Sequence, residues 1–383
     1  MSTLASSPRR FLMESAPGAR TLINGRWRDY FAGCSYLGLP GHPELVAAAV
    51  EALRQYGLTT ATSRGGFGEH PLYQAVEASA ARFFQTEQAL YYVSGYLGNA
   101  ILAQGLRGEY DHIFVDSAAH FSVYDGIHTV GLPVTQFRHR DADDLAAQCR
   151  ARLRPGERPL VISDGVFPVS GEIAPVPDYL AVLAQYPGAI LCLDDAHATG
   201  VIGAQGQGTW EYWASQGPTL LNSGAEVRVF TAHTLSKALG GHGGVIAGDG
   251  AFIEQLRQRS TTPGATSPPP LPAAAASAWA LNYVKDHPEL RQRLWDNVAL
   301  ARAGLRRLGW PLDDTPIPII CLAGRPGLDL ARIRDELFER DICVGHSTNY
   351  SSTPPGGALR IAIFTTHTTE QIERLIEELG KLL

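Results

Sequence analysis

The sequence predicts an α/β protein, with a mostly parallel sheet sandwiched by helices and a smaller α+β domain after it. Short apolar runs alternate with longer stretches whose apolar residues recur at three- and four-residue spacing, as in strands joined by crossover helices. A proline-rich segment at 261–272 then interrupts this alternation, and we expect it to be neither helix interior nor central strand. Polar residues follow several of the expected strands, at the edge where such sheets bind ligands.

The elements follow from these patterns in chain order. We expect six strands in the large domain, at residues 89–93, 112–115, 160–163, 189–193, 227–230 and 244–247. Its helices are expected at 97–106, 143–153 and 176–185. The smaller domain is expected to contain helices at 273–285, 297–308, 328–340 and 369–382, and strands at 317–322 and 359–364. We therefore divide the chain into an N-terminal arm (1–36), a large domain (37–270) and a small domain (271–383).

Composition restricts the classes of protein to which the chain can belong. With 45% hydrophobic and 18% charged residues, it can bury a large core. Its net charge of −6 argues against a nucleic-acid-binding surface, and no apolar run is long enough to span a bilayer. The five cysteines are odd in number and form no Cys-x-x-Cys pair, which argues against a disulfide framework or a zinc site. We expect a protein of a reducing compartment, by default the cytoplasm.

Lys237 is the most informative residue, because the chain has only three lysines against 29 arginines. It lies in the segment His-Thr-Leu-Ser-Lys-Ala-Leu-Gly-Gly at 233–241, directly after an apolar run. Lysine, unlike arginine, can lose its proton and attack a carbonyl. The pattern indicates either a Schiff base with an aldehyde cofactor or a loop lysine that binds water or an anion.

Two carboxylates and a histidine follow the strand expected at 189–193, in the segment Asp-Asp-Ala-His at 194–197. A helix N-cap with a polar loop histidine has the same appearance. That interpretation explains less well why an acid follows a run of apolar residues, since a buried acid needs a cationic partner. A protonated pyridine nitrogen is such a partner, which makes Asp194 a candidate for pairing with pyridoxal 5'-phosphate (PLP) and His197 a candidate for its ring hydroxyl.

Two further turns carry candidate cofactor contacts. Ser94, Gly95 and Tyr96 lie between an expected strand and a helix start, where free backbone N–H groups bind phosphate, although many βα turns look the same. His120 follows the strand expected at 112–115. Its ring is a candidate to lie flat on a cofactor, whereas a single loop histidine is more often structural.

Taken together, these motifs resemble the α-oxoamine synthases, a family of fold-type I PLP-dependent enzymes. The resemblance extends from about residue 36 to the C-terminus and depends on the order and spacing of motifs that are individually weak. The motifs are Tyr-Leu-Gly-Leu at 36–39, Thr-Ser-Arg-Gly-Gly at 62–66, Ser-Gly-Tyr at 94–96, Asp-x-x-x-His at 116–120, Asp-Gly-Val-Phe at 164–167, Asp-Asp-Ala-His-Ala-Thr-Gly at 194–200, Thr-Leu-Ser-Lys at 234–237, Thr-Ser-Pro-Pro-Pro at 266–270 and Ala-Leu-Arg at 358–360. The resemblance implies a seven-stranded type of sheet in the large domain.

The resemblance also implies a role for each matching residue at the cofactor. Lys237 forms the Schiff base and later moves the α-proton of the substrate. Asp194 pairs with the pyridine nitrogen, His197 bonds the ring oxygen, and His120 stacks on the ring face. The phosphate is held by residues of two turns, Ser94, Gly95, Tyr96 and Thr234.

The remaining implied contacts concern the substrate and a second subunit. Thr266 reaches the phosphate of a neighbouring subunit, since the family builds its sites at a homodimer interface. Arg360 binds the carboxylate of the amino acid, a role that suits its planar, two-pronged donor. Ser35, beside Cys34, lies where the family carries a substrate-binding Asn.

The implied reaction is a decarboxylative condensation of a small amino acid with an acyl-CoA or a related acyl thioester. It gives an α-aminoketone, CoA and CO2, and 8-amino-7-oxononanoate synthase-like activity is its commonest form. An aminotransferase or a lyase on the same fold is the second hypothesis, and a PLP-binding paralogue without activity is the third. A histidine expected over the ring argues against transamination, and the retained Lys237 and Arg360 argue against lost catalysis.

Several positions depart from the pattern of the family. Cys34 replaces the substrate-binding Asn or aligns beside it, and Pro168 replaces a serine that contacts a cofactor oxygen. Tyr73 stands where a histidine is usual near a helix start, and Phe121 is bulkier than the residue that usually follows the stacking histidine. The expected cofactor contacts are therefore retained, whereas the expected substrate contacts are altered.

Overall fold

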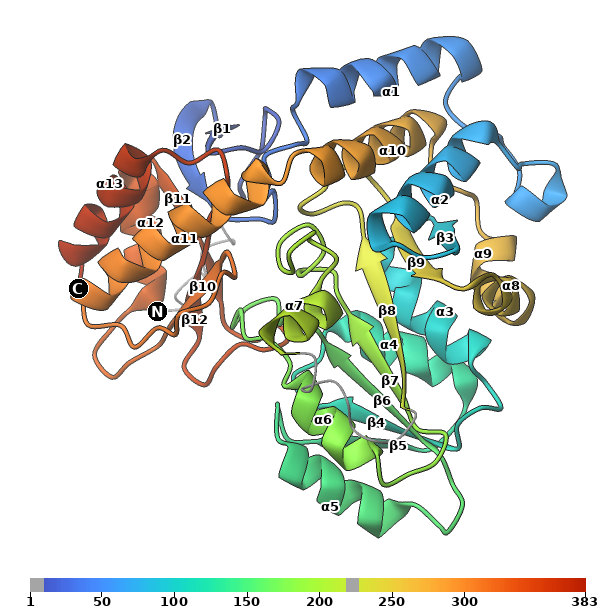
Figure 1. The fold of residues 1–383 in the computed structure, drawn as a ribbon. Helices are drawn as coiled ribbons and strands as arrows, with labels where there is room; N and C mark the ends of the chain where they lie inside the picture. The colour runs from blue at the N-terminus through green and yellow to red at the C-terminus, as the bar shows by residue number, and fades with distance from the viewer. Residues whose placement is uncertain (1–9, 218–226) are drawn as a thin grey trace, which may run out of the picture.

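A seven-stranded sheet forms the centre of the large domain in the computed structural model, which describes residues 10–217 and 227–383 (Figure 1). In spatial order its strands are β3 (Gln88–Tyr92), β9 (Gly244–Gly248), β8 (Arg228–Thr234), β7 (Ile190–Asp194), β6 (Pro159–Asp164), β4 (His112–Asp116) and β5 (Val134–Phe137). Neighbours from β8 to β5 pair in parallel, and β9 is antiparallel to both of its neighbours. The expected mostly parallel, seven-stranded sheet is confirmed.

Helices cover both faces of this sheet because its strands are apolar on both sides. On one face, alternate residues such as Ile113, Ile162 and Cys192 pack against α3 (Gly98–Gly105), α4 (Phe121–Ile127) and α8 (Gly250–Arg259). On the other face, Val161 and Leu191 pack against α5 (Ala142–Arg152) and α6 (Val176–Leu183). Two-sided burial of this kind is typical of parallel sheets and leaves only the strand ends for polar chemistry.

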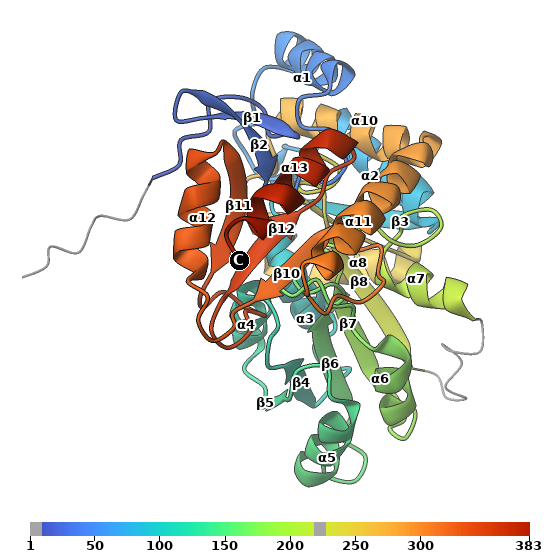
Figure 2. The same ribbon diagram turned by 90° about the vertical axis from the view of Figure 1, so that its left-hand side faces the viewer.

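Figure 2 shows the second, smaller sheet beside the first, with helices on its outer side. Its strand order is β1 (Arg20–Ile23), β2 (Arg26–Phe31), β11 (Ile342–Ser347), β12 (Ala358–Ala362) and β10 (Ile319–Ala323). Because β1 pairs with β2 and β2 pairs in parallel with β11, these two strands of the N-terminal arm lie in the sheet of the small domain. The division at residues 36 and 270 stays a prediction, and we propose that 10–31 be grouped with the small domain.

The remaining helices frame the two sheets. They are α1 (Pro43–Tyr56), α2 (Pro71–Phe84), α7 (Thr209–Gln216), α9 (Thr261–Ala265), α10 (Leu271–Asp286), α11 (Glu289–Arg307), α12 (Leu330–Glu339) and α13 (Thr369–Gly380). α10 packs against α1 and α2, and α11 packs against α13. Among the described residues, no helix has the length and apolar character needed to cross a membrane.

The proline-rich segment is more helical than the sequence suggested. We expected no helix interior within 261–272, but α9 occupies its first five residues and α10 begins at Leu271. Each helix places its proline, Pro263 or Pro272, in the first turn, where the backbone N–H has no partner within the helix to lose. The expectation was wrong because a proline excludes a residue from a helix interior but not from a helix start.

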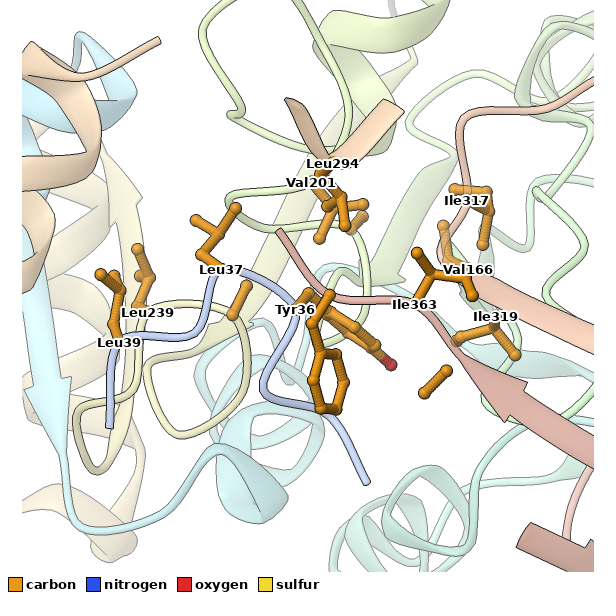
Figure 3. Close-up of a cluster of buried hydrophobic side chains, with 14 of the residues drawn as sticks. Tyr36, Leu37, Leu39, Val166, Val201, Leu239, Leu294, Ile317, Ile319 and Ile363 are labelled. Carbon is orange, nitrogen blue, oxygen red and sulfur yellow. The ribbon is translucent and has the colours of Figure 1, made fainter. Parts of the chain in front are cut away.

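One core joins the two domains. Figure 3 shows Tyr36 and Leu37 between large-domain residues such as Val201 and small-domain residues such as Ile319 and Ile363. All five side chains are at most 2% exposed. Removing apolar surface from water stabilises a protein by about 25 cal/mol per Å². This shared core therefore holds the small domain against the ends of the large-domain strands.

Candidate active site

A cavity of about 520 Å³ lies where the carboxyl ends of β6, β7 and β8 face the small domain. Asp164, Asp194 and Thr234 end these three strands, and the register pairs Asp164 with Asp194. The residues lining the cavity are Cys34, Ser94, Gly95, Tyr96, His120, Ser122, Asp164, Pro168, Val169, Asp194, Ala196, His197, Thr234, Ser236, Lys237, Gly345, His346, Ser347, Tyr350 and Arg360. Residues more than 300 positions apart in the chain therefore share one site.

Asp194 is a buried carboxylate that lines the cavity. It is 6% exposed, and it accepts hydrogen bonds from the backbone N–H of Ala196 (3.0 Å) and from Asn99 Nδ2 (2.7 Å). No basic side chain forms an ion pair with it in the described parts of the chain. Burial, with the nearby charge of Asp194, holds the pKa of Asp164 well above its usual value. A buried carboxylate of this kind needs a cation, and the cavity gives a cation access to it.

Lys237 lies three residues beyond the end of β8, on the loop that closes with a 3.0 Å backbone bond from Gly240. Its Nζ lies 3.0 Å from His197 Nε2. His197 Nδ1 lies 2.8 Å from the hydroxyl of Tyr36, which also contacts Arg360 Nη2 at 3.0 Å. Burial holds the pKa of His197 well below its usual value, so the ring is neutral.

The turn after β3 forms a close cradle with the end of β8. Ser94 caps the turn by accepting from the backbone N–H of Tyr96 (3.3 Å). A Cβ on Gly95 would lie 2.5 Å from the Oγ1 of Thr234, so only glycine allows this approach. The backbone amides of the turn and the Thr234 hydroxyl thus meet at the start of α3, an arrangement suited to a phosphate.

His120 lies at the start of α4 and faces the cavity. Its Nδ1 accepts from the backbone N–H of Ser122 (3.2 Å), and its Nε2 lies 2.6 Å from the hydroxyl of Tyr350. Its own backbone N–H donates to Asp164 (2.8 Å). Burial lowers the pKa of His120, which favours the neutral ring that stacks on an aromatic face.

Arg360 stands at the opposite side of the cavity, on β12. Its Nε donates to the backbone oxygen of Pro168 (2.6 Å) and its Nη1 to that of Gly33 (2.9 Å). Its Nη2 donates to Tyr36 (3.0 Å) and meets only the weak acceptor Cys34 Sγ at 3.8 Å. One hydrogen on each Nη therefore stays available for a carboxylate in the described site.

Two predicted residues do not reach the cavity. Ser35 is buried, and its hydroxyl donates to the backbone oxygen of Pro17 (3.3 Å), while Cys34 lines the cavity instead. Thr266 lies outside the cavity and donates to the backbone oxygen of Thr262 (2.8 Å). All the other predicted site residues line the cavity: Ser94, Gly95, Tyr96, His120, Asp194, His197, Thr234, Lys237 and Arg360.

Some positions that depart from the family pattern lie at or near the cavity, and one lies in the core of the large domain. Pro168 lines the cavity and contributes its backbone oxygen to Arg360, and Phe121 is 46% exposed next to His120. Tyr73 is fully buried in α2, where its hydroxyl donates to the backbone oxygen of Pro269 (2.8 Å). Of the departing positions, Cys34 and Pro168 line the cavity and can contact a bound molecule directly, whereas Phe121 and Tyr73 lie outside its lining.

Sequence reasoning missed three residues of the site. Tyr36 was noted as part of a motif but given no role, and Asn99 and Tyr350 were not singled out. Asn99 holds the carboxylate of Asp194 from α3, and Tyr350 holds His120 from the loop between β11 and β12. The available signal for Asn99 was a polar residue at the second position of α3, directly before the apolar run at 100–103. We find no such signal in the sequence for Tyr350.

Comparison with known proteins agrees with this geometry. Residues 33–379 match the model of the family described as aminotransferase class I and II. The chain belongs to that family. Within it, the chain is 36% identical to a putative 8-amino-7-oxononanoate synthase of Desulforudis audaxviator and 35% identical to an 8-amino-7-oxononanoate synthase of Methylococcus capsulatus; each match covers 97% of this chain and 93% of the relative.

The solved structures agree as well. A serine palmitoyltransferase from S. paucimobilis, solved with PLP and myriocin bound, superposes with a TM-score of 0.86 at 26% identity, over 97% of this chain and 92% of that one. The expected membership of the α-oxoamine synthases is therefore confirmed. The chain is a PLP-dependent C-acyltransferase of that group, and its reaction class is decarboxylative condensation to an aminoketone.

Three features of the cavity itself suit PLP. Asp194 is a buried carboxylate with which no basic side chain of the described residues forms an ion pair, so it would suit a protonated ring nitrogen. The close approach of Gly95 to Thr234 leaves amides and a hydroxyl for the phosphate. The amine of Lys237, 3.0 Å from His197 Nε2, faces the same cavity and would be the group to bond the aldehyde carbon. When bound, PLP supplies an electron sink for a carbanion at the substrate's α-carbon.

Proposed function

We propose that the chain condenses alanine with a thioester of a seven-carbon dicarboxylic acid, as the product name of its curated relatives implies. In 8-amino-7-oxononanoate, the amino-bearing carbon and the terminal methyl group are what alanine leaves after losing its carboxylate. The other seven carbons form an acyl group with a carboxylate at its far end. The observation that carries the proposal is the 35–36% identity over nearly the whole chain, with Lys237, Asp194 and Arg360 in one cavity.

The chain's own groups divide the work at the α-carbon. Arg360 binds the carboxylate of the amino acid through the hydrogens left on its two Nη atoms. Lys237, once displaced by the incoming amine, has its Nζ free to take the α-proton and to return one after condensation. His197 keeps that amine oriented at 3.0 Å. Burial of this end of the cavity excludes water and strengthens each polar contact.

The cofactor contacts are proposed residue by residue. Asp194, held by Asn99, pairs with the ring nitrogen, and His120 lies on the ring face. His197 donates to the ring oxygen. The residues proposed to hold the phosphate are Ser94, Gly95, Tyr96 and Thr234.

We further propose that the chain works as a homodimer. α1 exposes an apolar stripe, Val46, Val50 and Leu53, at four- and three-residue spacing. Phe67 is fully exposed, and Thr266 lies outside the cavity of its own chain. A second copy that covers these apolar residues and adds Thr266 to the phosphate would complete the site.

We also propose a cytoplasmic location, which the odd number of cysteines supports.

The experiment that tests the function pairs amino acids with thioesters. Purified protein is titrated with glycine, alanine and serine while the cofactor absorbance is followed, and a panel of acyl-CoAs is then added with an assay for free thiol. We expect alanine and a dicarboxylic acyl group to release thiol fastest. Release only with serine and a long, uncharged acyl chain would replace the substrate proposal, and no release with any pair would move the assignment to an aminotransferase or lyase.

A further inference from the structure

Four side chains link the two ends of the cavity by hydrogen bonds. Arg360 Nη2 lies 3.0 Å from the hydroxyl of Tyr36, that hydroxyl lies 2.8 Å from His197 Nδ1, and His197 Nε2 lies 3.0 Å from Lys237 Nζ. Tyr36 does not line the cavity; it is 0% exposed and its ring lies in the core cluster of Figure 3. The residue that joins substrate and cofactor contacts is therefore held rigidly by apolar packing.

The direction of each bond follows from counting hydrogens. Arginine has donors only, so the oxygen of Tyr36 accepts from Arg360. The phenol has one hydrogen of its own, and two side chains remain near it to accept that hydrogen: His197 Nδ1 at 2.8 Å and the sulfur of Cys34. The imidazole nitrogen is much the stronger acceptor, because a thiol sulfur accepts only weakly. A buried hydroxyl that pointed its hydrogen elsewhere would lose a bond that water supplies in the unfolded chain. Tyr36 therefore donates to His197 Nδ1.

This direction decides which nitrogen of His197 carries the hydrogen. The buried ring is neutral and has one N–H. Because Nδ1 accepts from Tyr36, the hydrogen is on Nε2 and points at Lys237 Nζ. A lone pair on a nitrogen accepts such a bond, and a lone pair is also what attacks a carbonyl carbon. The same Nε2–H is the donor that a ring oxygen of the cofactor needs.

We propose that Tyr36 is a positioning residue that fixes the Nε2–H tautomer of His197 and so directs a donor at Lys237 and at the cofactor. Arg360 sets the direction from the other end, because it cannot accept. The inference rests on the proposed use of Lys237 as the amine that holds the cofactor, and not on the choice of amino acid or acyl group.

Nitrogen NMR of the histidine rings tests the tautomer directly. The full-length protein is measured with its cofactor bound and after the cofactor has been removed, and the His197 signals are assigned by comparison with His197→Gln. We expect the Nε2–H tautomer in both forms. A hydrogen on Nδ1 in either form would overturn the proposal, and this result needs no other variant to fold.

A matched pair of variants then tests the role of the hydroxyl. Tyr36→Phe keeps the ring in the core, and we expect a mixture of His197 tautomers and a rate of PLP capture lowered about tenfold, as for one lost buried hydrogen bond. Tyr110→Phe is the control, since that hydroxyl is also buried and donates to the backbone oxygen of Ala103 (2.7 Å), away from the cavity. We expect this control to match the wild type.

The outcomes separate this proposal from the proposed function. A folded Tyr36→Phe protein with an unchanged His197 tautomer and unchanged PLP capture would contradict the role of Tyr36. Neither readout uses a substrate, so failure of every thioester to release thiol would count against the condensation alone. Equal losses in Tyr36→Phe and Tyr110→Phe would show that the effect comes from the core and would also contradict the proposal.

Discussion

The two ends of the cavity are built in different ways. The end that faces Lys237, Asp194 and Thr234 is made from neighbouring strand ends of one parallel sheet, whose register fixes their separation. The end at Arg360 is assembled from segments of both domains, because its guanidinium joins the backbone of Gly33 and Pro168. A sheet edge holds reacting groups in place by itself, whereas the other end depends on how the small domain packs.

This difference accounts for two of the positions at which the chain departs from its family, Cys34 and Pro168. The strand-end residues keep the types that PLP chemistry needs, while Cys34 and Pro168 replace polar side chains at the Arg360 end. At that end the backbone oxygens of Gly33 and Pro168 bind the guanidinium of Arg360. A backbone oxygen can keep this contact when the side chain of its residue changes. We therefore expect substitutions at the two ends to affect different measured quantities.

Lys237→Ala gives the largest expected effect. Removing the amine takes away the proposed attachment of the cofactor and the proposed proton carrier. We therefore expect kcat to fall at least about a thousandfold and the absorbance of covalently attached PLP to disappear. Lys285→Ala is the control, because Lys285 is exposed at the end of α10. An intact attached-cofactor absorbance in Lys237→Ala would refute the role of Lys237.

Arg360→Ala is expected to change substrate binding and leave the cofactor in place. Loss of a two-pronged bond to a carboxylate should raise the KM for the amino acid about 10- to 100-fold, with the PLP absorbance unchanged. Arg332→Ala, on the exposed side of α12, is the matched control. If KM stayed the same while cofactor binding weakened, the assignment of the two ends would be reversed.

Stability should report on the loop that carries Pro168. His139 bridges Asp116 (2.9 Å) and Glu172 (3.0 Å) at the end of that loop, and these carboxylates raise its pKa to about 9 although burial opposes them. Because the folded pKa lies above the unfolded value of about 6.5, this stabilisation is complete below pH 6.5 and is lost as pH rises through 9. After allowance for solvent screening, we expect a loss of about 1–2 kcal/mol.

Urea unfolding at pH 6 and pH 9.5 measures this loss in the wild type and in His139→Gln. The variant is expected to be less stable at pH 6 and to show the smaller change between the two pH values. Equal pH dependence in the two proteins would mean that His139 is not the titrating group.

Tyr350→Phe gives the smallest expected effect. It removes the 2.6 Å bond to His120 Nε2 but leaves the bond from Ser122 to Nδ1, so the ring keeps one anchor. We expect kcat to fall about three- to tenfold, with the KM for the amino acid nearly unchanged. Tyr56→Phe, an exposed tyrosine of α1, serves as the control. A Tyr350→Phe effect as large as that of Lys237→Ala would show that the small domain contributes directly to the chemistry.

The same contrast shows how much could be predicted from the sequence. Asp194 and Lys237 could be predicted to share one edge of the sheet because each comes at or just after the end of an apolar strand, so their placement is local. Strand β11 was missed, and with it the loop that brings Tyr350 to His120 across 230 residues. Strand β5 was also missed, because this four-residue edge strand is largely exposed and lacks an apolar run. Contacts between domains leave no local pattern in the chain.

The central claim is that the protein joins an amino acid to an acyl thioester with loss of CO2. The most direct test of it is the ratio of CO2 to free thiol released in one reaction. Alanine labelled in its carboxylate is mixed with the protein, PLP and the CoA thioester of a seven-carbon dicarboxylic acid, and labelled CO2 and free thiol are counted together. We predict equal amounts of the two, with an aminoketone as the organic product. Conversion of alanine to a 2-oxo acid, without release of thiol, would contradict the account.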